Sequence, residues 1–570
     1  MADFFEHYPS SPDQLVGIAG ELVRHSRGAN VAITHVQHGV NRATDAIDGD
    51  LTFPMEQSSH PVVYLGRDVA AGAYFASGAI MRFAEAVKTY NTGVDRLNKQ
   101  IPEGEFDTLT GGRAETLHVL EAEQARLEGD LDDEAGRVAA MLERGPNAKD
   151  LAYLKSHGYL MPLDPKDLPA IPTGSPADIR AWWAGLTLAH QAALIAYAPR
   201  RLGNLNGLPA EVRDEANRIV LAEDYAALKA KDPGKLTSVE MKALANMEKI
   251  LGQLAEREAH KDPITGEPVP VQLYIYDPYA FDGDGRVAIA VGNLDEADHV
   301  AVNVRGATNT QGLSATRTEN MYDQSRWASG DSVAVLDWMG YDAPNTGAPD
   351  HPAWDIPETG IDQPDSFGVS NTWMADAGAQ QLAADVAGLQ ASRSDDPAHL
   401  TVVGHSYGST TAAIAAEEYG MRPNDLVLIG SPGVPADEAS DLGIEDGHTW
   451  VGRASHDSEA SLGSAFALGN EPADSDFGAN RFRAEHVERE DTDDNHSASY
   501  YGRNSEGLSN IAAIVTGQYG NVVEAPPLDS EDEEDGEKDP EYDRKPHHVG
   551  HLPKQPLPTP EPTVDRRYVP

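Results

Sequence analysis

The chain has 570 residues, with 44 Lys and Arg against 92 Asp and Glu, and its formal net charge is −48 at pH 7. At about 150 residues per domain, this length predicts two to four domains. This strong negative charge opposes binding to phosphate backbones and to anionic membranes. We therefore expect no nucleic-acid partner. The chain contains no cysteine, which excludes disulfides, thiolate metal sites and a cysteine nucleophile.

The first residues, MADFFEHYPSSPDQ, carry acids and prolines where a secretory signal has a basic start and an apolar run. No stretch approaches about 18 uninterrupted apolar residues. The most apolar helix-like stretch, 70–87, is interrupted by Gly72, Ser77, Arg82 and Glu85. We therefore expect neither Sec export nor a transmembrane segment, and we expect a cytoplasmic location.

Three apolar stripes with helical spacing occupy the N-terminal part of the chain, over 15–47, 65–101 and 117–142. Between the first two stripes, DGDLTFP contains Gly49 and Pro54, residues that stop helices. The pattern predicts a helical hairpin or bundle in which the stripes form the packing faces.

From Gln272 the periodicity changes to short runs rich in β-branched residues, which predict strands. The runs are LYIYD, RVAIAVG, HVAVNVRG, SVAVLDW, HLTVVGH, DLVLIGSPG and HTWVGRA. Amphipathic helical stretches, MADAGAQQLAADVAGLQAS and STTAAIAAEEYG, precede and follow HLTVVGH. This alternation of strand and helix predicts an α/β domain with a mainly parallel sheet.

The C-terminal part contains the acidic run DSEDEEDGEKDPEYD and then a Pro-rich segment, neither of which has an apolar period. We expect such a tail to be disordered, because it cannot bury enough apolar surface. The boundaries predict four parts: a helical hairpin or bundle (1–160), a helical segment packed on the sheet domain (161–265), the α/β domain (266–522) and the disordered acidic, Pro-rich tail (523–570).

Gly404-His405-Ser406-Tyr407-Gly408 is a G-x-S-x-G sequence between a predicted strand and a predicted helix. In that context the serine sits on a tight turn above the sheet, and the glycines are needed because a Cβ would clash there. The helix N-terminus then favours the oxyanion that forms on attack. The motif predicts Ser406 as a nucleophile, with a structural turn as the alternative.

A serine nucleophile requires a carboxylate and a histidine base, which follow it in the order acid, then histidine. Asp457, just past the run HTWVGRA, is the expected acid, and its alternatives lie in the loop after LVLIGSPG: Asp437, Asp441 and Asp446. His496, before the helix-like LSNIAAIVTG, is the expected base, and its alternatives are His448, His456 and His486.

The oxyanion hole is expected to combine the N–H of Tyr407 with the loop VNVRGATNTQG, where Gly306 and Ala307 are the candidates. The alternative for this Gly-containing loop is a simple turn. The sequence contains no P-loop, dinucleotide fingerprint or His/Glu metal motif, so we expect no cofactor and no metal.

Several further stretches carry a family resemblance: WWAGL, LGNLNGLPAEVRDEANR, VAVNVRG, LDWMGYDAP, VVGHSYGS, LIGSPG, WVGRASHDS and NHSASYYG. Over 182–520 the chain resembles the bacterial alpha/beta hydrolases of unknown function that carry a helical region ahead of the hydrolase domain. The resemblance implies an alpha/beta-hydrolase domain with Ser406, Asp457 and His496 as its triad. That family often has Gly-Asp-Pro at the acid, where this chain reads His-Asp-Ser.

We therefore expect an esterase- or lipase-like serine hydrolase that cleaves a small-molecule or lipid carboxylic ester through an acyl-enzyme on Ser406. The alternatives are an acyltransferase with the same triad and a non-catalytic interaction protein on a hydrolase scaffold. The N-terminal hairpin is similar to those of type VII secretion substrates, but DGDLTFP replaces their Trp-x-Gly turn. We expect these helices to mediate a homo-oligomer or to bind a protein partner, with type VII-like export as the alternative to a cytoplasmic location.

Overall fold

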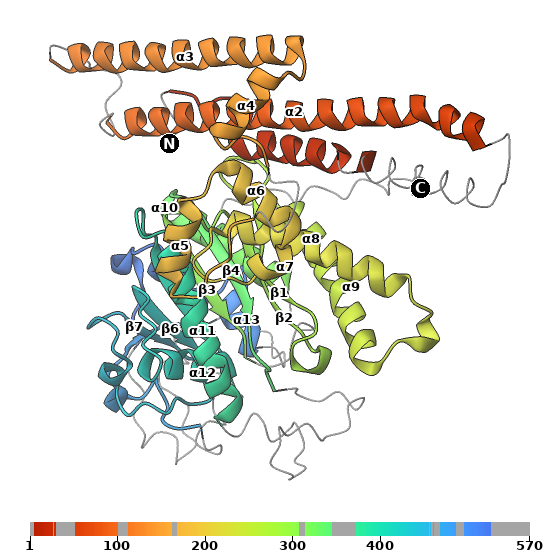
Figure 1. Ribbon diagram of the computed structural model, residues 1–570. Coiled ribbons are helices and arrows are strands. Elements are labelled where there is room, and N and C mark those ends of the chain that lie inside the picture. Colours follow the sequence, from red (N-terminus) through yellow and green to blue (C-terminus); the bar gives the residue numbers. More distant parts are fainter. Residues whose placement is uncertain are drawn as a thin grey trace, which may run out of the picture. The chain divides into compact units, whose positions relative to one another are not determined.

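The computed structural model describes residues 5–26, 28–29, 52–100, 112–161, 168–306, 314–344, 372–454, 457, 460, 468–485 and 495–525 (Figure 1). The chain divides into two compact units. The first comprises Met1–Leu208 with Glu215–Val220, and the second comprises Pro209–Asp214 with Leu221–Pro570. The boundaries of the four predicted parts stay a prediction, and all but the first three residues of the predicted tail lie outside the described residues.

The described part of the first unit is helical. A helix covers 12–26, and the later ones are α2 (Thr52–Asn98), α3 (Gly112–Arg144), α4 (Ala148–Ser156), α5 (Pro176–Ala184), α6 (Leu188–Tyr197) and α7 (Pro199–Leu202). The helices predicted from the second and third stripes are confirmed, and most of the first stripe past residue 29 lies outside the described residues. That Gly49 and Pro54 stop a preceding helix stays a prediction, because residues 30–51 lie outside the described residues, but Pro54 does not interrupt α2. It falls in the first turn of α2, where the missing N–H has no intrahelical partner to lose.

The apolar stripes of α2 and α3 pack against each other. Val87, Tyr90, Val94 and Leu97 from α2 form one core cluster with Leu120, Leu127 and Leu131 from α3. Gly93 permits the close approach, because a Cβ there would lie 2.6 Å from Leu127 Cδ1. The Arg82–Glu134 ion pair adds a polar link between the two helices.

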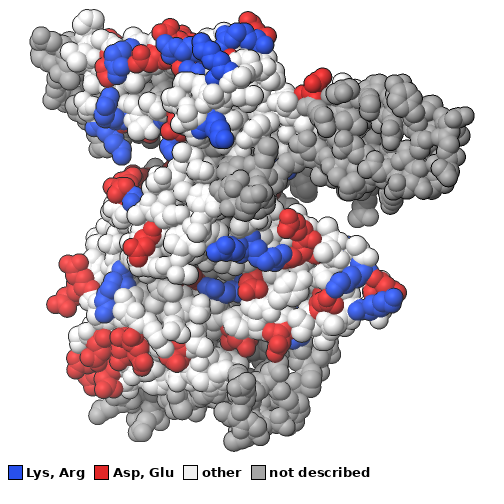
Figure 2. Space-filling view, in the orientation of Figure 1, with Lys and Arg blue, Asp and Glu red and all other residues white. Residues whose placement is uncertain are grey.

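The face of α3 seen at the top of Figure 2 carries basic and acidic side chains side by side. They form pairs within the helix, such as Arg126 with Asp130 at 2.7 Å.

The predicted oligomer or protein partner at the N-terminal helices, and the predicted location, stay predictions. Among the described residues, no helix is both long enough and apolar enough to cross a membrane.

The second unit contains an eight-stranded sheet in the order β1-β2-β4-β3-β5-β6-β7-β8. Its strands are β1 (Val271–Asp277), β2 (Arg286–Val291), β3 (His299–Val304), β4 (Val333–Met339), β5 (His399–His405), β6 (Asp425–Ile429), β7 (Thr449–Gly452) and β8 (Asn480–Phe482). From β4 to β8 all neighbours are parallel, while β2 pairs antiparallel with β1 and β4. The mainly parallel sheet is confirmed, with all seven predicted strands.

Helices cover both faces of this sheet (Figure 1). They are α9 (Ser238–Glu258), α10 (Ala315–Ser329), α11 (Trp373–Ser392), α12 (Tyr407–Glu417), α13 (Asn495–Tyr501) and α14 (Glu506–Val515). The helix α8 (Ala210–Lys229) is divided between the two units. Short 3-10 helices lie at Pro233–Lys235, Phe281–Gly283, Ala439–Leu442, Ser475–Phe477 and Tyr519–Asn521. On one face, Trp338 donates its indole N–H to Asp385 of α11 at 3.0 Å. On the other, Val335 shares a core with Ile511 of α14. Coverage on both faces explains why the strands read as continuous apolar runs.

Candidate active site

Ser406 lies alone on the turn between β5, which ends at His405, and α12, which begins at Tyr407. Its backbone has φ 56° and ψ −135°, a conformation that a residue with a Cβ rarely adopts. The turn is fixed by the Ser406 N–H, which donates to the carbonyl of Ile429 at the end of β6 at 2.9 Å. The serine therefore stands at the carboxyl edge of the parallel strands, where α/β sheets bind ligands.

The two glycines of the motif are required by close backbone contacts. A Cβ on Gly404 would lie 2.7 Å from Ser409 Cα, and a Cβ on Gly408 would clash with the carbonyl oxygen of Val304. The start of α12 consequently lies directly against β5 and β3. These distances agree with the expectation from the sequence that a Cβ at either glycine would clash in this turn.

Asp457 and His496 form a hydrogen-bonded pair at the same edge. His496, near the start of α13, donates from Nδ1 to Asp457 Oδ1 at 2.7 Å. The Asp457 side chain is fully buried, and its carboxylate also accepts the Ala460 N–H at 3.0 Å. Burial by itself would raise the pKa of Asp457, but the hydrogen bond and charge of His496 lower it below its ordinary value. The acid is therefore a carboxylate at neutral pH, and it holds His496 in the tautomer whose Nε2 can accept a proton.

The pair lies beside the serine turn. His405 donates from Nε2 to the backbone carbonyl of His496 at 2.7 Å, and the two rings have centroids 4.7 Å apart. A Cβ added to Gly430 would lie 3.0 Å from both Asp457 Oδ2 and His496 Cε1. Gly430 directly follows Ile429, the residue that accepts the Ser406 N–H. Three segments far apart in the sequence thus bring the predicted nucleophile, acid and base to one edge of the sheet.

Gly306, one oxyanion candidate, lies against the serine turn. A Cβ placed on it would be 2.8 Å from Ser406 Cβ and 2.8 Å from the backbone nitrogen of Tyr407. The Tyr341 hydroxyl lies 2.5 Å from the Gly306 carbonyl, which fixes the loop after β3. The other candidate, Ala307, lies outside the described residues.

Three of the four alternative acids and bases that the structure describes have partners elsewhere. His448 binds Asp425 at 2.9 Å, at the amino edge of the parallel strands. Asp441 accepts the Glu438 N–H at 3.1 Å, and Asp437 accepts from Asn470 at 3.3 Å. Asp446 is exposed, and His456 and His486 lie outside the described residues.

Two contributors to the site were missed from the sequence, Tyr500 and His405. The Tyr500 hydroxyl donates to Asp457 Oδ2 at 2.8 Å. Both residues were visible in the stretches NHSASYYG and GHSYGS, but no sequence pattern says that these two stretches meet.

No group of three or more His, Asp or Glu side chains arranged to hold a metal occurs within the described residues.

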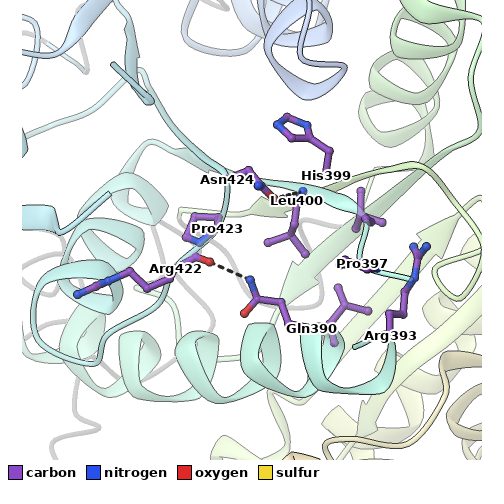
Figure 3. Close-up of a pocket in the computed structure, with 11 residues that line it drawn as sticks. Gln390, Arg393, Pro397, His399, Leu400, Arg422, Pro423 and Asn424 are labelled. Atoms are coloured by element: carbon purple, nitrogen blue, oxygen red, sulfur yellow. Dashed lines mark hydrogen bonds between the residues drawn. The ribbon is translucent and has the colours of Figure 1, made fainter. Parts of the chain in front are cut away.

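A pocket of about 480 Å³ lies at the opposite edge of the sheet (Figure 3). It is lined by Val300, Leu389, Gln390, Arg393, Pro397, Ala398, His399, Leu400, Arg422, Pro423 and Asn424. Figure 3 shows Gln390 bonded across it to the backbone of Arg422, while the His399 ring points away. The pocket is formed where β5 begins, whereas Ser406 follows the end of that strand, so it includes none of the predicted site residues.

Residues 281–467 match the alpha/beta hydrolase family. This match spans β2 to β7, the serine turn and Asp457, and it agrees with the sheet order and the strained serine between β5 and α12. The second unit contains an alpha/beta-hydrolase domain. His496 lies beyond the matched residues, so its place in the site is known only from the geometry of this domain.

Two relatives of this chain are described as uncharacterized proteins. An uncharacterized protein of Mycobacterium tuberculosis is 33% identical over 425 residues, 65% of this chain and 62% of that protein. An uncharacterized protein of Mycobacterium bovis is 29% identical over 235 residues, 39% of this chain and 80% of that protein. The chain thus spans about 62% of the length of the first of these relatives.

Solved structures similar to the hydrolase domain include an esterase from Pyrobaculum calidifontis, at 14% identity and TM-score 0.26 over 52% of this chain and 97% of that chain. A dienelactone hydrolase from Anabaena variabilis has 13% identity and TM-score 0.26 over 45% of this chain and 99% of that chain. At such TM-scores, neither likeness adds weight to the fold or to the function.

Proposed function

We propose that the protein is a serine hydrolase that cleaves a carboxylic ester through an acyl-enzyme on Ser406, with His496 as base and Asp457 as its orienting acid. The observation that carries the proposal is the 2.7 Å hydrogen bond between His496 and Asp457, placed beside a serine with φ 56°. A backbone strained in this way is retained where the surrounding structure determines it, and such residues cluster at functional sites.

In the first half-reaction, Ser406 Oγ attacks the ester carbonyl carbon while its proton moves to His496 Nε2. The negative charge that develops on the carbonyl oxygen is stabilised by the N–H of Tyr407 and by the loop at Gly306 and Ala307. The carbon–oxygen bond to the alcohol then breaks, and His496 gives its proton to the departing oxygen. The acyl group is left on Ser406.

In the second half-reaction, a water molecule takes the place of the alcohol and gives a proton to His496 as it attacks the acyl-enzyme. Collapse of the intermediate releases the carboxylic acid and returns the proton to Ser406 Oγ. In both halves the imidazolium of His496 is stabilised by the buried Asp457 carboxylate, because opposite charges attract more strongly away from water. The pair thus supplies a proton acceptor that is also held in one orientation.

The proposal is tested with short p-nitrophenyl esters. Ser406→Ala should reduce kcat by at least about 10³-fold, because only binding and the oxyanion site would remain. The matched control is Ser440→Ala, which removes the hydroxyl of an exposed serine. It should leave activity unchanged. A Ser406→Ala variant that is folded and as active as the parent protein would overturn the proposal.

The same assay separates hydrolysis from acyl transfer. An added primary alcohol competes with water for the acyl-enzyme, and the product ratio reports which acceptor the site prefers. We expect the free acid to dominate at low alcohol concentration. A transfer product in large excess under those conditions would assign the triad to an acyltransferase instead.

A further inference from the structure

His405 is the last residue of β5 and directly precedes Ser406, yet the proposed reaction gives it no role. His405 is buried, with 6% of its surface exposed, and its Nε2 lies 2.7 Å from the backbone carbonyl oxygen of His496. The ring packs between aromatic neighbours, with centroid distances of 4.7 Å to His496, 5.8 Å to Tyr500 and 5.3 Å to Tyr501. His405 therefore joins the nucleophile turn to the helix that carries the proposed base.

The hydrogen bond fixes the state of the His405 ring. A carbonyl oxygen only accepts, so Nε2 of His405 carries the hydrogen. Burial lowers the pKa of His405 well below 6.5, and positive charge on His496 and Arg317 lowers it further. The nearby Asp457 acts in the opposite direction but more weakly. The ring is neutral at neutral pH, so it donates to His496 without placing a second positive charge beside the imidazolium.

The start of α13 is fixed by side chains of other elements. The helix has seven residues, and its first N–H groups have no intrahelical partners. Besides Asp457, which binds the His496 ring, two side chains from other elements bind there: His405 at the carbonyl of His496, and Arg317 of α10 at the Ser497 hydroxyl at 2.7 Å. The position of the His496 imidazole relative to Ser406 thus depends on bonds made by neighbouring elements.

We propose that His405 is a positioning residue, whose hydrogen bond to the His496 carbonyl holds the imidazole within reach of Ser406. The inference rests on the proposed function, because it assigns His405 to that same site. Proton transfer needs a hydrogen-bonded geometry between the two reacting groups, and a displacement of about 1 Å can cost about 100-fold in rate. His405 acts on the rate only through His496.

The variant His405→Phe keeps an aromatic ring and removes the donor, and His405→Gln keeps a donor near the same place. The matched control is His399→Phe at the other end of the same strand, where His399 Nδ1 lies 3.0 Å from the Val515 carbonyl of α14. The full-length variants are compared by kcat and KM on p-nitrophenyl butyrate, by the rate of fluorophosphonate labelling, and by Tm.

We expect His405→Phe to lower kcat and the labelling rate together, by about tenfold or more, with little change in KM. His405→Gln should restore most of both rates. His399→Phe should lower Tm while leaving kcat unchanged, because it removes a hydrogen bond of the same kind far from the serine. Rescue by glutamine and the split between kcat and KM are effects that a loss of stability alone would not produce.

Three results would overturn the inference: a folded His405→Phe variant with the parent kcat, a His405→Gln variant that is folded but as slow as His405→Phe, or equal losses of kcat in His399→Phe. If His405→Phe does not fold, His405→Gln decides, since full activity supports the role of the donor and a large loss contradicts it. If instead Ser406→Ala keeps full activity, the proposed function itself fails, and this inference fails with it.

Discussion

The buried hydroxyl of Tyr500 donates to Asp457 Oδ2 at 2.8 Å, while His496 binds the other carboxylate oxygen at 2.7 Å. Tyr500 Oη also accepts the backbone N–H of Ala454, just after β7, at 3.0 Å. Tyr500 and His496 lie one helical turn apart on α13, so a single short helix orients both oxygens of the acid. The carboxylate is thereby aimed at the imidazole and has little freedom to turn away.

Removing that hydroxyl tests this arrangement. Tyr500→Phe should lower kcat by about tenfold, since Asp457 Oδ2 loses a buried hydrogen bond worth about 1–3 kcal/mol. The control is the neighbouring Tyr501→Phe, which loses the 2.8 Å bond to Asn303 instead. It should lower Tm to a similar extent with a much smaller effect on kcat. Equal kcat values for Tyr500→Phe and the parent protein would show that Tyr500 does not orient the acid.

The acid itself should matter more than its orienting tyrosine. Asp457→Asn should lower kcat by up to about 10⁴-fold, because an amide fixes the wrong tautomer and cannot stabilise the imidazolium. Asp441→Asn is the matched control, since Asp441 caps a 3-10 helix away from the serine. Its kcat should be close to that of the parent protein. If Asp441→Asn is the impaired variant in ester hydrolysis, the acid has been assigned to the wrong residue.

A buried charge cluster adjoins the oxyanion loop. Asp337 of β4 is fully buried and binds Arg257 at 2.8 Å and Arg305, the neighbour of Gly306, at 2.5 Å. Asp337→Ala would leave two buried guanidinium groups without their shared carboxylate, so we expect a loss of about 3–5 kcal/mol in the free energy of unfolding. Urea denaturation measures this loss. A change below about 1 kcal/mol would show that the cluster is not a structural requirement.

A second buried carboxylate, Asp425, lies at the amino edge of β6 and is bound by His399 at 3.0 Å, as well as by His448, Trp450 and Tyr519. Burial alone would raise the pKa of Asp425 and lower that of His399. The hydrogen bonds from these four side chains more than offset burial at Asp425, so its pKa lies below 3.8. The hydrogen bonds from His399 to Asp425 and to the Val515 carbonyl, with the charge of Asp425, raise the pKa of His399 above 6.5.

These shifts set a pH window for stability. The contribution of His399 is fully present below about pH 6.5 and is lost as pH rises through its raised pKa, while that of Asp425 is present above about pH 3.8 and is lost as pH falls. The difference in Tm between the parent protein and His399→Phe should therefore be largest between these values and shrink at alkaline pH. A difference that is constant across that range would show that the two groups do not form an ion pair.

Much of the fold follows from local sequence patterns. Strands such as LVLI and the helix after Ser406 have unambiguous apolar periods. Gly404 and Gly408 mark the serine turn, where a Cβ at either position would clash with neighbouring backbone. β8 escaped prediction because three residues carry no period. α10 escaped because most of its residues are polar, and its buried Asn320 and Arg326 bind other segments.

The site was only partly predictable, because local patterns do not show which distant segments come together. The serine turn is local, whereas the bonds from Tyr500 to Asp457 and from His405 to His496 join segments that meet only in the folded chain. A sequence pattern identifies residues with suitable chemistry. It does not say which of their neighbours will hold them in place.

Covalent labelling of the proposed nucleophile tests the central claim most directly. A fluorophosphonate reacts with a serine hydroxyl that a neighbouring base activates, and peptide mass spectrometry then locates the modified residue. We predict stoichiometric labelling on Ser406 that is lost in Ser406→Ala and strongly slowed in His496→Ala. A folded protein that is not labelled at Ser406, or is labelled equally fast without His496, would contradict it.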